Sequence, residues 1–127
     1  MILTEDGYSL SCTTCPKTGQ PCAAGLRLAR QLGAALRAGE GTIQDDFEMT
    51  GHGQLSGDCG RECGVVYSLY KRGFRVFCGV PQDTDPEALI RFSDAFLGNG
   101  PVTRGPVPRA MVVGSRIARH PVPTARA

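Results

Sequence analysis

The six cysteines constrain this chain more than any other feature of its sequence. Five of them fall in two clusters, one made of Cys12, Cys15 and Cys22, the other of Cys59 and Cys63 in a glycine-rich stretch. The residues between the clusters are enough for one helix and one strand. A fold that brings the clusters together would gather four or five thiols around one point. Soft thiolates gathered in this way select zinc, copper(I) or an iron–sulfur cluster.

Length and composition predict one soluble domain. The chain has 127 residues, 41% of them hydrophobic and 20% charged, which is enough for a core without disulfides. The amino terminus lacks a basic segment, and no apolar stretch approaches about 18 residues, so we expect neither a signal peptide nor a membrane span. The expected location is the cytoplasm. Clustered cysteines there bind metals or act in catalysis rather than forming disulfides.

Charge is distributed unevenly along the chain. Residues 101–127 contain five arginines and no acid, whereas residues 1–100 contain the nine remaining basic residues and all twelve acids. We therefore expect a metal- or iron–sulfur-binding domain at 1–100 and a Pro/Arg-rich tail at 101–127. The tail either lies solvated across the acidic body or docks an acidic partner protein. Nucleic acid is not expected, because the net charge is only +2 and no aromatic residue is interleaved with the arginines.

Hydrophobic periodicity and turn residues predict the order β-α-β, then a β-hairpin, then α. The hairpin turn is expected at Lys71–Gly73, with Gly73 at positive φ. Such an order is the layout of a thioredoxin-like α/β domain, in which helices flank one mixed sheet and the loops after the first two strands lie together. The predicted elements are a strand at Tyr8–Cys12, a helix from Ala23 to about Arg37, a strand from Thr42 to about Gly53, a hairpin over Val65–Val80, and a helix after the capping box Thr84–Glu87.

Two cysteines have a position that suggests their role. Cys22 falls at the start of the first helix, where the helix dipole and free N–H groups stabilise a thiolate. Cys78 stands between Phe77 and Gly79 in a strand and is expected to be a core residue. The five loop cysteines beside glycines would bury little surface, so a purely structural role does not suit them.

The spacing Cys12-x9-Cys22-x36-Cys59-x3-Cys63 resembles that of the thioredoxin-like [2Fe–2S] ferredoxins. More closely, the chain is similar over roughly residues 8–121 to a family of small bacterial predicted metal-binding proteins. The resemblance implies a thioredoxin-like fold, a metal or iron–sulfur site, a homodimer and a link to cobalt and corrinoid metabolism. The matching segments are Cys12–Cys15 (Cys-Thr-Thr-Cys), Gly25–Leu28, Cys59–Cys63, Lys71–Gly73 and Arg116–Pro121.

The favoured interpretation is a [2Fe–2S] cluster held by Cys12, Cys22, Cys59 and Cys63, with Cys15 competing with Cys22, since a ferredoxin needs only two cysteines in the first loop. Such a protein would not be an enzyme. It would transfer single electrons, or sense redox state, with a redox partner protein.

The alternative is a metal-handling site for zinc, copper or cobalt that draws on Cys12, Cys15, Cys22, Cys59 and Cys63, with either histidine as a further ligand. Thiol–disulfide exchange by Cys12 and Cys15 is less favoured. Thioredoxin-like oxidoreductases need a proline facing such a pair, and the chain has none between its residues 22 and 80.

Overall fold

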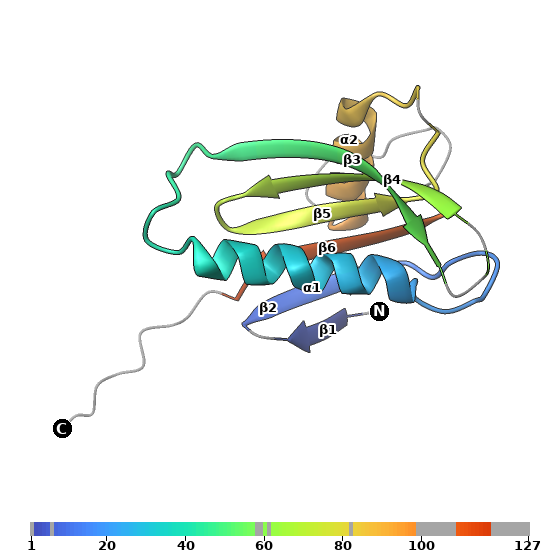
Figure 1. Cartoon of the computed structure of the whole chain (residues 1–127), viewed down its shortest axis with the longest axis horizontal. Helices are drawn as coiled ribbons and strands as arrows, with labels where there is room; N and C mark the ends of the chain where they lie inside the picture. Colours follow the sequence, from blue (N-terminus) through green and yellow to red (C-terminus); the bar gives the residue numbers. More distant parts are fainter. Residues whose placement is uncertain are drawn as a thin grey trace.

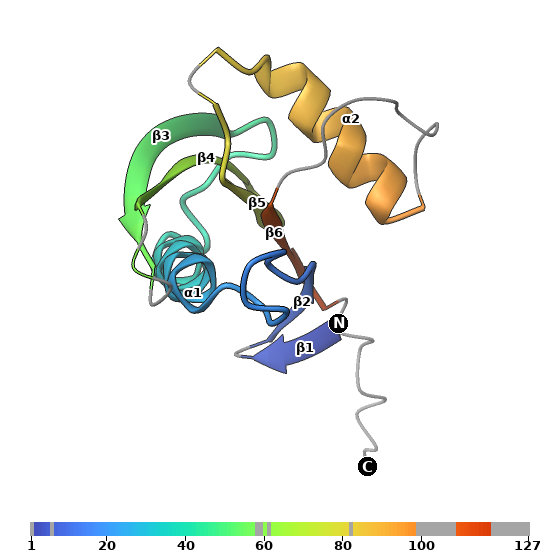
Figure 2. The ribbon, with the colours of Figure 1, turned by 90° about the vertical axis from the view of Figure 1, so that its right-hand side faces the viewer.

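The computed structural model describes residues 2–5, 7–57, 60, 62–81, 83–98 and 109–117. These residues form a six-stranded sheet with one helix on each face (Figures 1 and 2). The strand order is β1-β2-β6-β5-β4-β3, and every neighbouring pair is antiparallel. The elements are β1 (Ile2–Glu5), β2 (Tyr8–Cys12), α1 (Ala23–Ala38), β3 (Glu48–Ser56), β4 (Glu62–Tyr70), β5 (Gly73–Cys78), α2 (Pro86–Phe96) and β6 (Ala110–Arg116).

The predicted thioredoxin-like fold is wrong. A β-α-β unit would place the strand after α1 parallel to β2 within a mixed sheet, but β3 lies at the far edge, antiparallel to β4. The reason is β6, which the sequence analysis placed in an extended basic tail. Its residues Met111, Val112 and Val113 are at most 2% exposed, and the strand pairs with β2 on one side and β5 on the other.

Most of the local elements were predicted correctly. The first predicted strand is β2, the two helices begin where their caps indicate, and β4 and β5 form the hairpin. The turn differs: Tyr70 pairs with Gly73, so Gly73 belongs to β5 and does not have a positive φ. A Cβ at Gly73 would lie 2.3 Å from the carbonyl oxygen of Gly114. Glycine is therefore required there by the close approach of β6.

The sheet face toward α1 carries the larger core. The buried stripe of α1 includes Ala29, Leu32 and Leu36. Against it, the ring centroids of Tyr8 and Phe74 lie 5.7 Å apart, tilted by 50°. Cys12 and Cys78 belong to the same buried cluster, and Cys22 packs against it. This face therefore holds cysteines from strands that are far apart in the sequence.

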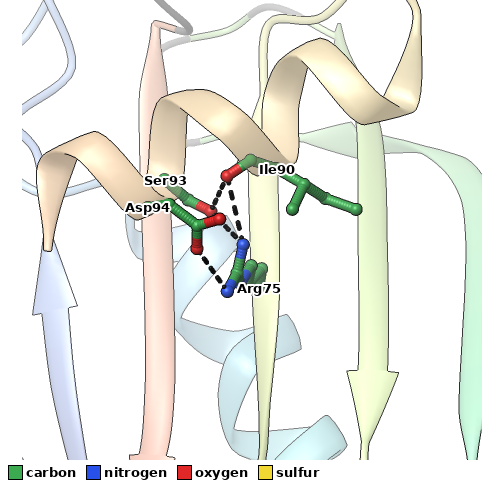
Figure 3. A network of polar contacts seen from close by, with 4 residues as sticks. All are labelled: Arg75, Ile90, Ser93 and Asp94. Carbon is green, nitrogen blue, oxygen red and sulfur yellow. Dashed lines mark hydrogen bonds and ion pairs between the residues drawn. The ribbon is translucent and has the colours of Figure 1, made fainter. Parts of the chain in front are cut away.

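The opposite face is covered by α2, as Figure 2 shows. Besides apolar contacts, Arg75 of β5 joins the sheet to this helix (Figure 3). Its guanidinium pairs with Asp94 at 2.8 Å and donates hydrogen bonds to Ser93 Oγ at 2.6 Å and to the Ile90 carbonyl at 3.1 Å. Among the described helices, none is long and apolar enough to cross a membrane.

Candidate thiol site

Four of the cysteines gather at the end of the sheet where α1 begins. Figure 1 shows the first turn of α1, the loop after β2, the end of β3 and the start of β4 at this end. Cys22 is the N-cap of α1, Cys63 is the second residue of β4, Cys78 ends β5, and Cys15 lies in the loop between β2 and α1. Cys63 stands two residues before buried Val65 and so faces α1 as well.

The N-cap places a sulfur atom directly at the helix terminus. Cys22 has extended backbone angles, its carbonyl accepts a hydrogen bond from Leu26 N, and its Sγ accepts one from the backbone N–H of Gly25 at 3.4 Å. The predicted position of Cys22 is thus confirmed. An anionic sulfur here would be stabilised by this N–H group and by the positive end of the helix dipole.

Gly25 shows how closely two sulfur atoms approach the first turn of α1. A Cβ at this buried position would lie 3.0 Å from Cys78 Sγ and 3.6 Å from Cys22 Sγ. The missing side chain therefore leaves room for both sulfurs on the same patch of the helix. A thiol from β5 and the thiol that caps α1 meet here, although 55 residues separate them in the chain.

Cys78 is the centre of this group. Burial raises the pKa of its thiol, and Cys22 raises it further through its charge and a side-chain hydrogen bond, followed by the charges of Cys63 and Cys15. Cys78 is 2% exposed, which confirms the prediction that it is a core residue. Its thiol neighbours were missed. The hairpin register was the available signal, since Cys78 pairs with Val65, two residues from Cys63.

The other two predicted ligands are Cys12, which lies on β2, and Cys59. Cys12 is 1% exposed at the end of β2, where it pairs with Val112 of β6, and burial raises the pKa of its thiol. Val112 in turn pairs with Val76 of β5, so Cys12 lies two strands away from β5. Cys59 lies outside the described residues. Of the predicted ligands, Cys22 approaches the same patch of α1 as Cys78, and Cys15 and Cys63 affect the Cys78 thiol through their charges.

The described cysteines form no disulfide bond, and they do not form a complete site with several metal ligands. Cys12, Cys15, Cys22, Cys63 and Cys78 are all unbridged. Within the described ranges, no group of three or more His, Cys, Asp or Glu side chains could hold a metal ion. A site with four ligands would need the thiols to be drawn together on binding, or a contribution from outside these ranges.

No family model, curated protein or solved structure matches the sequence. The resemblance to ferredoxins and to the small metal-binding family therefore stays a prediction made from the cysteine motifs. The chemistry of the described thiols and of the amino terminus of α1 beside them is what indicates a function.

The buried thiols of Cys12 and Cys78 should make the stability of the protein depend on pH. Below about pH 8.5 the thiols of Cys12 and Cys78 are protonated in both the folded and the unfolded chain. Above it the unfolded chain releases these protons, while the raised pKa makes the folded thiols release theirs less readily. The free energy of unfolding should then fall by about 1.4 kcal/mol per pH unit for Cys78, and Cys12 should add to the fall in the same direction.

Urea unfolding between pH 7.5 and 10 measures this slope. Because lysines and tyrosines also titrate, the informative quantity is the difference between the wild type and Cys78→Ala. The variant should lose stability less steeply with rising pH, by about 1.4 kcal/mol per pH unit. Equal slopes for the two proteins would mean that Cys78 ionises as readily in the folded state as in the unfolded one.

Proposed function

We propose that this protein binds a soft metal ion through thiolates at the end of the sheet where α1 begins, and handles that ion rather than catalysing a reaction. The observation that carries the proposal is the approach of the Cys22 and Cys78 sulfurs to the same patch of α1 at Gly25, with Cys15 and Cys63 at the same end of the sheet. Thiolate sulfur is the ligand type that selects copper(I), zinc and related soft ions.

The helix terminus supports the same conclusion. A metal ligand has to be deprotonated, and a thiolate at the N-cap of α1 gains a hydrogen bond from Gly25 N. The first turn of α1 contains no acidic residue that would repel the anion. The described cysteines form no disulfide, which suits a reducing compartment, so we place the proposed activity in the cytoplasm. We propose no role in nucleic-acid binding.

A [2Fe–2S] cluster that exchanges single electrons with a redox partner protein is the second candidate. The number of cysteines favours it, because Cys59 and Cys63 could supply two ligands and the described thiols two more. A homodimer belongs to this candidate. We rank it second because the ferredoxin resemblance implies a thioredoxin-like fold, and that is not the fold of this chain.

The test is an anaerobic purification followed by an absorption spectrum and analysis of iron, sulfide, zinc and copper. The proposal expects a colourless protein that carries, or takes up on reconstitution, one soft metal ion per chain. Cys22→Ser should lose it. Serine is a good N-cap residue, so this variant removes the sulfur without removing the cap.

The same experiment separates the two candidates. A red-brown protein with iron and sulfide in equal amounts would replace the proposal by the iron–sulfur cluster. A protein that takes up neither a soft metal ion nor a cluster after reconstitution under reducing conditions would rule out both.

A further inference from the structure

We infer that Cys22 and Cys78 form a two-coordinate site for copper(I) against the first turn of α1. The inference rests on the proposed function and names both the ion and the ligand pair. It departs from the ligands expected from the sequence, because it uses the buried Cys78 and leaves out Cys12.

The geometry of the pair carries this assignment. Both sulfurs lie against Gly25, at 3.0 Å and 3.6 Å from the point where a Cβ would stand. Cys22 is also close enough to Cys78 to raise the pKa of its thiol. Copper(I) is a soft d¹⁰ ion that is satisfied by two thiolates in a linear arrangement.

The number of ligands favours copper(I) over zinc. Structural zinc requires four ligands in a tetrahedron, and in the described part of the chain no group of three or more suitable side chains could hold an ion. A linear site needs only two. Since Cys78 is 2% exposed, water has little access to its sulfur. The surroundings therefore suit a closed site without a solvent ligand.

Charge at the helix terminus favours the bound state. When copper(I) binds, two S–H bonds break, two protons leave to solvent and two Cu–S bonds form, with no change in oxidation state. The resulting unit carries one negative charge, and a buried anion is costly unless it is stabilised. The Gly25 N–H group and the dipole of α1 provide that stabilisation at Cys22.

The test is an anaerobic competition for copper(I) between the protein and a chromophoric copper(I) chelator, under reducing conditions. Wild-type protein should retain one copper(I) per chain, and X-ray absorption should show two sulfur neighbours. Cys22→Ser and Cys78→Ser should each weaken binding at least about 100-fold, since each removes a ligand. Cys12→Ser is the matched control, because Cys12 is 1% exposed and belongs to the same core cluster as Cys78. It should bind like the wild type.

Other outcomes would overturn the inference. Wild-type affinity in Cys78→Ser, or three or more sulfur neighbours around the metal, would remove the two-coordinate pair and leave soft-metal binding in place. If Cys78→Ser fails to fold, the copper(I) affinity of Cys22→Ser tests the inference by itself, because serine at the N-cap preserves α1. Wild-type protein that holds no soft metal ion would instead remove the proposed function itself.

Discussion

Replacing Arg75 by alanine should lower the free energy of unfolding by about 3 kcal/mol. The side chain is 16% exposed and links β5 to α2 through Asp94, Ser93 and the Ile90 carbonyl (Figure 3). Its loss would leave fully buried Ser93 with one partner fewer and Asp94 without its cation. We expect the lower end of the range for buried pairs, because Asp94 is 37% exposed and, among the described residues, Arg75 Nε has no hydrogen-bond partner.

Urea unfolding of Arg75→Ala beside Lys71→Ala measures the effect against a suitable control. Lys71 pairs with Asp45, whose side chain is 88% exposed, and such solvent-exposed pairs contribute little. The arginine variant should therefore lose far more stability than the lysine variant. Equal losses would mean that α2 is held on the sheet by its apolar contacts alone.

Replacing Gly114 by alanine should destabilise the protein by about 3 kcal/mol, through overpacking. A Cβ on this residue of β6 would lie 2.2 Å from Cζ of Phe74, its pairing partner on β5. Phe74 is 1% exposed and packs against Tyr8, so its ring has little room to move. The expected result is a lower urea midpoint with a similar dependence on denaturant concentration.

Gly53→Ala is the matched control for this variant. Gly53 lies on β3, where an added Cβ would meet Val65 at an ordinary 3.5 Å, so alanine should be tolerated or slightly stabilising. Combining Gly114→Ala with Phe74→Leu should recover part of the lost stability. If Gly114→Ala is as stable as the wild type, or the double variant recovers nothing, the clash with Phe74 is not the cause.

Local signals in the sequence predicted the local elements. The capping signal at Thr84–Glu87 predicts the start of α2, although its N-cap is Asp85. The leucine stripe predicts α1, and the alternating residues on either side of Lys71–Gly73 predict the hairpin. These elements are specified within a few residues. The topology was not predicted because it depends on β6, whose short apolar run at 111–113 is followed by polar residues and indicates an anchor as readily as a strand. Its partners, β2 and β5, are distant in the sequence.

The candidate site was also predicted only where local sequence signals specify it. The position of Cys22 at the start of α1 follows from the local helix signal and is correct. The neighbours of Cys78 depend on strand register and on where α1 crosses the sheet. The sequence therefore indicated only that Cys78 is a core residue. Cys12 ends the first predicted strand as expected, but the insertion of β6 moves it away from β5.

The late position of β6 in the chain has a consequence for how the protein is made. Thr13 accepts a hydrogen bond from Met111 N across 98 residues, and the β1–β2 hairpin joins the rest of the sheet only through β6. A two-stranded hairpin is marginally stable by itself. During translation the first hairpin therefore has no sheet to join until residues 110–116 have left the ribosome. Until then the edges of β2 and β5 that pair with β6 keep unpaired N–H and C=O groups, which are open to chaperones and to neighbouring chains.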